Sequence, residues 1–199
     1  YHVRNNDLLR LRRGLYAAVD PEADPLTQPV DPFVVASKLV KDAVLAYHTA
    51  LEFHGKAYSV HERFTYLTRS TTRLFRFRSQ VFRAVPFPSK LASQGRQDFD
   101  VKSLDRAGAS VRVTSLERTL VDVLDRPDLS GGWEEIWRSL EQVEFFALDR
   151  VVEYALLLSN ATTSAKVGFF LDQHRDSLMV EDKHLQPLQA QVPKSPHYL

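Results

Sequence analysis

The sequence predicts an α+β fold with a small, mainly antiparallel sheet followed by a helical C-terminal half. Apolar and polar residues alternate in segments 57–68 and 74–85, which is the period of half-buried strands. After residue 114 the apolar residues recur at helical spacing, and the later segments that keep this period are 133–143, 148–159 and 164–174. Helices packed on one side of a small sheet are the simplest architecture for this order of elements.

Composition excludes several classes of function. The chain has 199 residues, of which 44% are hydrophobic, so it can bury the core of a full domain. Without cysteine it can form no disulfide, thiolate metal site or cysteine nucleophile. No apolar run approaches the roughly 18 residues of a membrane span and no signal peptide is apparent, so we expect a cytoplasmic protein without a membrane partner. Met179 is the single methionine, so we expect the chain starting at Tyr1 to lack an upstream segment.

Charge is distributed unevenly although the net charge is only +1. Residues 1–19 carry +3, residues 63–97 carry +8 without a single acid, and residues 114–182 carry −8. Two basic segments in a nearly neutral chain can form a positive face for a polyanion. Solvated basic strands are the simpler explanation.

The first predicted element is a β-hairpin. In the stretch LLRLRRGLYA, leucines alternate with Arg10 and Arg12, Arg13 and Gly14 provide turn chemistry, and an apolar run resumes at Leu15. A hairpin with arginines on one face is typical of the wing of a winged helix-turn-helix, whose arginines contact DNA. The alternative is an ordinary edge hairpin that positive charge protects from strand addition.

A linker with three prolines follows at residues 20–30 and divides the chain. We therefore predict that residues 1–19 end a winged-helix domain and that residues 31–199 form a C-terminal domain. Asp31 is expected to cap a short helix that begins with proline. A second short helix is expected from His48, closed by Gly55.

Several short strands are predicted between the first two helices and the helical half. Segments 57–68 and 74–85 are expected to pair as antiparallel strands across the turn at 69–72. Further short strands are expected near 99–101 and 110–113. The pattern thereby predicts one compact sheet in the middle of the chain.

The second of these strands carries a basic face. Its phenylalanines share one side, where we expect core packing, and its arginines share the other. Such a face can follow a nucleic-acid backbone, and it can equally be a solvated surface. The residues of this possible secondary basic patch are Arg69, Arg73, Arg76, Arg78 and Arg83.

The stretch TSLE at 114–117 predicts the start of the best-defined helix. Its pattern fits a capping box, in which a hydroxyl accepts a backbone N–H and the glutamate bonds back to the cap. For Glu117 and Arg118 we expect a cap and a surface or domain-bridging ion pair.

An enzymatic function would rest on Asp98, Asp100 and Lys102. The stretch from Asp98 to Lys102 contains the D-x-K element with which restriction-type nucleases hold a divalent cation and position water. Such a site needs a further acid upstream, and Glu62 would have to serve from across a hairpin. A metal-dependent nuclease is therefore one alternative, and a module whose acidic helices bind a protein partner is another.

The histidines give no recognised catalytic or metal pattern. Only His54 and His61 are close enough to suggest a ligand pair, and their spacing across a glycine fits no standard one. His48 and His54 are expected to be a helix-end residue and a packed residue. The chain also has no phosphate-binding glycine loop and no nucleophile elbow. We therefore expect no catalysis, no metal and no cofactor.

Three segments carry a resemblance to a known family: RRGLYAAVDP at 12–21, YHTALEFHG at 47–55 and VTSLERTLVDVLDRPDLSGG at 113–132. In order and spacing they resemble the AbiEi-like transcriptional regulators, which are the antitoxins of type IV abortive-infection toxin–antitoxin systems. The resemblance implies the remnant wing of an N-terminal winged helix-turn-helix followed by an α/β antitoxin domain. His48 departs from the small residue that the family places before T-A-L.

The resemblance also implies a function. Arg10, Arg12 and Arg13, together with Arg4, would contact double-stranded DNA, while most of the recognition helix would lie upstream of the first residue. The protein would repress its own promoter through inverted repeats. It would antagonise a nucleotidyltransferase-like toxin without forming a stable complex, and it would not be an enzyme.

Overall fold

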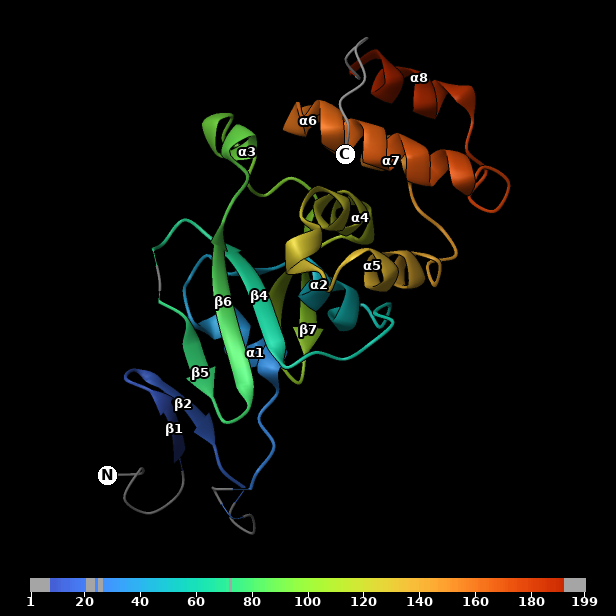
Figure 1. Cartoon of the computed structure of the whole chain (residues 1–199). Helices are drawn as coiled ribbons and strands as arrows, with labels where there is room; N and C mark the ends of the chain where they lie inside the picture. Colours follow the sequence, from blue (N-terminus) through green and yellow to red (C-terminus); the bar gives the residue numbers. More distant parts are fainter. Residues whose placement is uncertain (1–7, 21–23, 25–26, 72, 192–199) are drawn as a thin grey trace.

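The computed structural model describes residues 8–20, 24, 27–71 and 73–191. A two-stranded hairpin stands beside one end of a six-stranded sheet, and the C-terminal helices lie at the other end (Figure 1). The predicted α+β class is confirmed, and the C-terminal half is helical.

The N-terminal hairpin forms as predicted. Strands β1 (Leu8–Arg12) and β2 (Leu15–Ala18) pair antiparallel around Gly14, whose φ of +80° suits the tight turn. Leu11 and Leu15 pack against the apolar cluster between the sheet and the first helix. The strand pairing has a register shift between Arg10 and Arg12, so the side chains of β1 do not alternate strictly. Arg10 pairs with the exposed Tyr16, whereas Arg12 pairs with Leu15, which packs on that cluster.

The central sheet has the strand order β5-β6-β4-β3-β8-β7. The pairings β5–β6, β4–β3 and β8–β7 are antiparallel, whereas β6–β4 and β3–β8 are parallel, so the sheet is mixed. The strands are β3 (Val44–Leu45), β4 (Arg63–Thr68), β5 (Phe75–Phe77), β6 (Gln80–Pro86), β7 (Val101–Arg106) and β8 (Ala109–Thr114).

One predicted pairing is wrong. Alternation predicts a single antiparallel pair for 57–68 and 74–85, but the second segment folds back on itself at Arg78 and Ser79 and forms both β5 and β6. Strand β6 then runs parallel to β4. The turn carries no glycine or proline, and Arg78 takes a φ of +53°, which non-glycine residues rarely adopt. The sequence pattern of segment 74–85 therefore gives no sign of the turn at Arg78 and Ser79.

Helix α1 (Pro32–Lys38) covers one face of the sheet. Its start is the predicted one, because the Asp31 carboxylate accepts the backbone N–H groups of Phe33 and Val34 at 2.9 and 3.2 Å. Phe33 packs edge-on against Phe64 of β4, with ring centroids 5.5 Å apart. Helix α2 (His48–Phe53) also forms where expected.

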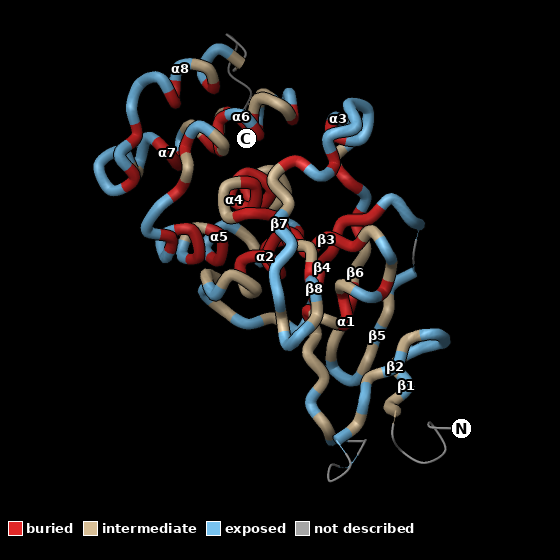
Figure 2. Tube along the Cα trace, turned by 180° about the vertical axis from the view of Figure 1, so that it is seen from behind, coloured by how far each residue is buried: buried red, intermediate tan, exposed pale blue. Residues whose placement is uncertain are grey.

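The helical half holds the largest buried apolar cluster, and Figure 2 shows α4 as a buried element. No helix in the described ranges is long and apolar enough to cross a membrane. Alternation and helical periodicity do not predict α8, which carries Pro187 inside it and packs on α6 and α7. The helices after β6 are α3 (Ser89–Ser93), α4 (Leu116–Asp125), the 3-10 helix η1 (Pro127–Leu129), α5 (Trp133–Leu140), α6 (Leu148–Leu158), α7 (Ala161–Gln173) and α8 (Asp182–Gln191).

Helix α4 begins almost as predicted. Its cap is Ser115 rather than Thr114, since the Ser115 hydroxyl accepts the N–H of Arg118 at 3.2 Å. Glu117 does not bond back to the cap, because its carboxylate accepts the N–H of Ala147 at 3.2 Å and ties α4 to the start of α6. The helix start is thus confirmed, whereas the reciprocal capping box is not.

Candidate functional site

The predicted single arginine face of the β1–β2 hairpin does not form, because the register shift after Arg10 turns Arg12 toward the main body and Arg13 lies in the turn. Arg10, Arg12 and Arg13 are all exposed. Arg12 also donates a hydrogen bond to the backbone carbonyl of Leu39, just after α1, which attaches the hairpin to the main body. Arg4 lies outside the described residues. The hairpin therefore presents two arginines free of this backbone contact and one arginine that docks the hairpin.

The secondary basic patch does not form one row. Arg76 is exposed on β5, whereas Arg78 lies in the turn and donates to the carbonyl of Gln28 at 2.7 Å. Arg69 follows β4 at the opposite end of the sheet from that turn, as the β4–β6 register shows. Arg83 is half-buried on β6 and contributes to the lowered pKa of Asp128, whose main cause is a hydrogen bond from Arg126. Arg73 is exposed just before β5.

The acids of the nuclease alternative are engaged in separate pairs. Asp98 forms an ion pair with Arg112. Asp100 accepts the Ser115 hydroxyl at 2.8 Å and lies 3.3 Å from Lys102. Glu62 lies elsewhere, at the rim of a cavity on the β4–β6 side of the sheet. In the described ranges the only group of three side chains spaced to hold a metal ion excludes all of these acids.

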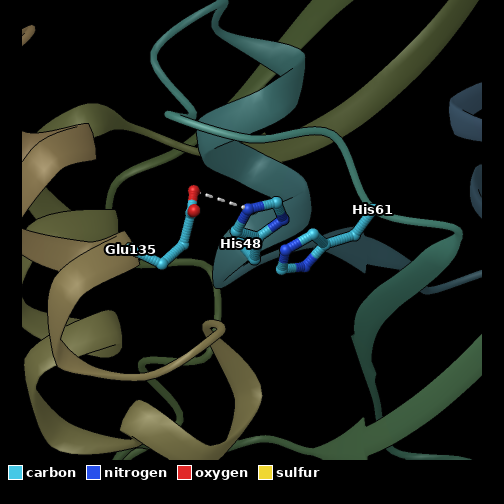
Figure 3. Close-up of side chains that lie close together, drawn as sticks. All are labelled: His48, His61 and Glu135. Carbon is cyan, nitrogen blue, oxygen red and sulfur yellow. Dashed lines mark hydrogen bonds and ion pairs between the residues drawn. The ribbon is translucent and has the colours of Figure 1, made fainter.

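That group is the histidine cluster, His48, His61 and Glu135 (Figure 3). His48 begins α2, His61 lies in the loop before β4, and Glu135 lies on α5. His48 Nε2 lies 3.0 Å from Glu135 Oε1, and the two imidazole rings stack with centroids 3.8 Å apart at 10°. One donor atom from each residue falls within 4.8 Å of the other two.

Surrounding groups hold the histidine cluster in place. The Ser59 hydroxyl and amide donate to the Glu135 carboxylate at 2.6 and 3.0 Å, and the Ser139 hydroxyl donates at 3.1 Å. Glu52 accepts the backbone N–H of His61 at 2.5 Å, and its Oε1 also lies 3.2 Å from His48 Nδ1. Glu52 therefore positions both histidines.

Burial and hydrogen bonding set the protonation of this cluster. Burial lowers the pKa of His61, and the adjacent His48 lowers it further, so the His61 ring is neutral near pH 7. Burial acts to raise the pKa of Glu135, but the hydrogen bonds from Ser59, His48 and Ser139 outweigh it and the pKa is lowered. The cluster thus combines a carboxylate with a neutral imidazole, and both are competent ligands.

The histidine cluster borders an open cavity of about 660 Å³. Both histidines line it, together with side chains of either charge, among them Arg63, Arg76 and Asp128. Gly131 approaches the cluster so closely that a Cβ there would lie 2.9 Å from His61 Cε1 and 2.8 Å from Glu135 Cγ. Glycine is needed at this position both for this approach and for its φ of +82°.

Local sequence pattern misses the histidine cluster. The pair considered from spacing was His54 and His61, but His54 Nε2 contacts the backbone carbonyl of Thr114 at 2.8 Å and plays a packing role. His48 is a helix-end residue as expected, yet it also faces His61 across the ring stack. Glu135 comes from a helix that reaches the site only through tertiary packing. Only the unusual His48 before T-A-L marks the site in the sequence.

The α4 cluster, Arg118, Asp122 and Tyr154, corrects the prediction of a surface ion pair. Arg118 is 0% exposed, and its guanidinium donates to the carbonyls of Gln97 and Phe99 at 2.8 and 2.7 Å and to Asp122 at 3.3 Å. The Tyr154 hydroxyl donates to Asp122 at 2.6 Å. Burial raises the pKa of Tyr154 well above its ordinary value, so the phenol keeps this proton. Arg118 and Asp122, both within the family-like segment at 113–132, therefore tie α4 to α6 and to the strand β7 region.

Comparison with known proteins supports the fold of the chain and does not bear on its function. No protein-family model matches the chain, and no curated protein matches it. Among solved structures the chain is similar to the crystal structure of the RV2827C protein from Mycobacterium tuberculosis, with a TM-score of 0.61 and 18% sequence identity. The similarity covers 98% of this chain and 70% of that one.

Proposed function

We propose that the protein is a DNA-binding transcriptional regulator that contacts double-stranded DNA through the β1–β2 hairpin. The observation that carries this proposal is the arrangement of the hairpin: its leucines pack on the core, while Arg10 and Arg13 are exposed. A guanidinium group binds phosphate oxygens in a bidentate manner, and phosphate contacts position a protein along a duplex. Contacts of Leu11, Arg12 and Leu15 with the main body hold the hairpin in place, so it can present these groups to a DNA backbone.

A second feature supports the same surface. In both views of the molecule, β5 lies at the end of the sheet where the hairpin stands (Figures 1 and 2). Arg78, in the turn between β5 and β6, donates to the carbonyl of Gln28, and the Gln28 side chain donates to the carbonyl of Ala18 at the end of β2. This turn therefore lies beside the hairpin, whereas Arg76 faces the cavity next to the histidine cluster. Phosphates spaced along one DNA backbone could contact both the hairpin and the turn at Arg78, because the electrostatic attraction adds over all the charges of a surface.

The regulatory role rests on the resemblance to AbiEi-like antitoxins. The signature Arg13-Gly14-Leu15-Tyr16 spans the turn of the hairpin and the start of β2, and the segment from Ser115 to Leu124 forms the start and body of α4. We propose that the protein represses its own promoter at inverted repeats. In this proposal the larger domain counteracts a nucleotidyltransferase-like toxin without a stable complex, and the protein performs no catalysis itself.

DNA binding is tested by fluorescence anisotropy with a labelled duplex from the region upstream of the gene. Replacing Arg10 and Arg13 together by alanine should weaken binding and lower the slope of log affinity against log salt by roughly two, one for each lost phosphate contact. The matched control is the double change Arg175→Ala and Lys183→Ala, which removes the same charge near α8. Equal losses in both variants would show that net charge alone, and not the hairpin, attracts DNA.

The antitoxin role is tested by growth of cells that express the neighbouring toxin gene. The Arg10/Arg13 double variant should still restore growth while it no longer represses a reporter fused to its promoter. A failure of the unaltered chain to restore growth would contradict the antitoxin role. It would not affect the DNA-binding proposal, which the anisotropy measurement tests separately. Co-purification of the toxin at high salt would instead contradict neutralisation without a stable complex.

A further inference from the structure

We propose that His48, His61 and Glu135 bind a divalent transition-metal cation of the zinc class at the edge of the open cavity. This inference is independent of DNA binding and of the antitoxin role. Two imidazole nitrogens and one carboxylate oxygen are the ligands of one common type of open zinc site, in which the fourth position stays free. The chain supplies this donor set from three different elements.

The hydrogen-bonding capacity of His48 points to a cation at this place. His48 is 2% exposed, with Nε2 at 3.0 Å from Glu135 and Nδ1 at 3.2 Å from Glu52. Within the described residues Nδ1 is buried and forms no hydrogen bond. A neutral imidazole carries one N–H and cannot donate to both carboxylates. A metal ion between Nε2 and Glu135 would leave the proton on Nδ1, where it would face Glu52.

This arrangement matches the outer shell of known metal sites. Histidine ligands commonly donate their second ring N–H to a carboxylate, which fixes the orientation of the ring and raises its basicity. Glu52 lies 3.2 Å from Nδ1 with its side chain only 6% exposed, so a small rotation of the His48 ring would form this hydrogen bond. The same carboxylate also accepts the backbone N–H of His61 at 2.5 Å. One outer-shell residue therefore orients both imidazole ligands.

A small rearrangement would complete the coordination. A tetrahedral ion with bonds near 2.0–2.1 Å places its ligand atoms roughly 3.3 Å apart, whereas the donor atoms here lie within 4.8 Å of one another. His61 is half-buried in the loop before β4, so its ring can tilt out of the stack toward the ion. His48 and Glu135 are buried and already in contact, so they form the fixed side of the site.

The neighbouring cavity supplies the open position. His48 and His61 both line it, and a water molecule or an anion entering from solvent could serve as fourth ligand. Basic side chains, Arg63 and Arg76, and acidic side chains, Glu62 and Asp128, line the same cavity, so a water molecule is the simplest fourth ligand. The proposed site is thus a metal centre that is accessible from solvent.

The test is metal binding by the full chain after treatment with a chelator and dialysis. Zinc affinity is measured by competition with a chromophoric chelator, and cobalt(II) serves as a spectroscopic probe of coordination. We expect one ion per chain, a visible cobalt absorption typical of a tetrahedral N/O site, and a higher melting temperature with zinc. Absence of stoichiometric binding at micromolar zinc would overturn the proposal.

Variants locate the ion. His61→Asn and Glu135→Gln should each weaken zinc binding by more than the roughly 10- to 100-fold that loss of an outer-shell partner costs, and Glu52→Gln should fall within that range. His174→Asn removes a histidine outside the cluster and should leave zinc affinity unchanged. Glu135→Gln retains the shape of the side chain, so it decides the question if His61→Asn does not fold by circular dichroism. Wild-type affinity in folded Glu135→Gln would place the ion elsewhere and refute the site.

Discussion

The molecule contains two compact polar clusters whose surroundings differ. The α4 cluster is enclosed by the helical core, and its charged and polar groups bond mainly to one another and to the backbone carbonyls before β7. The histidine cluster borders a solvent-accessible cavity, and its central imidazole lies between two carboxylates that it cannot both satisfy when neutral.

This difference separates a structural role from a binding role. Enclosed polar groups that are mutually hydrogen-bonded fix the packing of the elements around them, and removing one leaves a buried partner without compensation. Polar groups with spare capacity beside a cavity can accept a ligand. Changes in the α4 cluster should therefore mainly lower the stability of the fold, and changes in the histidine cluster should mainly weaken the proposed metal binding.

The largest effect is expected for Arg118→Ala. It would leave the Asp122 carboxylate buried without its cation and two backbone carbonyls without donors, at a cost of about 3–5 kcal/mol in the free energy of unfolding. Urea denaturation measures this cost. The control Arg126→Ala removes an arginine just after the same helix whose ion pair with Asp128 is exposed, and it should cost less than about 1 kcal/mol. Similar costs in the two variants would contradict the structural role of the α4 cluster.

The second-largest loss of stability is expected for a substitution beside the histidine cluster. Gly131→Ala would force a Cβ against His61 and Glu135 in addition to the strain of a positive φ, and we expect a loss of roughly 2–4 kcal/mol. Gly55→Ala has the same sign of φ but open space around it, so it should cost only about 1 kcal/mol. Thermal and urea unfolding of both variants measure the difference. Equal losses in the free energy of unfolding would mean that His61 and Glu135 can move to accommodate the extra Cβ and are not held in fixed positions.

Much of the fold could be predicted from sequence because its signals are local. The hairpin around Gly14, the cap at Asp31 and the stripe of α4 follow from residues within a few positions of one another. The partners of the strands could not be predicted in this way, because β4 pairs parallel with β6 and β3 with β8, and these contacts are distant in sequence. The two-residue β3 is too short to show any period.

The candidate sites differ in the same way: some follow from local sequence, and others depend on residues that meet only in the folded chain. Alternation was enough to direct Arg10 outward, because a strand imposes its period on neighbouring residues, whereas Arg13 is exposed because it lies in the turn. Periodicity could not show that Arg118 is buried, since a charged residue next to an apolar stripe is usually solvated. The histidine cluster needs His48 and Glu135 to meet across 87 residues, and no spacing rule joins them.

A buried hydrogen bond next to His48 provides an intermediate effect. The Thr49 hydroxyl accepts the backbone N–H of Thr65 at 2.7 Å, which ties α2 to β4. Thr49→Val keeps the volume but leaves that buried amide without an acceptor, and it should lower the free energy of unfolding by about 1–3 kcal/mol. Thr49→Ser keeps the hydroxyl and should restore most of this loss in the same urea experiment. A valine variant as stable as the serine variant would show that α2 is held by packing alone.

The smallest effects are expected in the hairpin, which belongs to neither cluster. Arg10→Ala and Arg13→Ala should each change the free energy of unfolding by less than about 0.5 kcal/mol, because both side chains are exposed. Arg12→Ala should cost roughly 1 kcal/mol, because its guanidinium donates to the Leu39 carbonyl and docks the hairpin. If all three variants unfold alike while only Arg10 and Arg13 affect DNA binding, the docking role of Arg12 is wrong. If Arg12→Ala is the least stable and also weakens DNA binding, the position of the hairpin, and not charge alone, determines the contact.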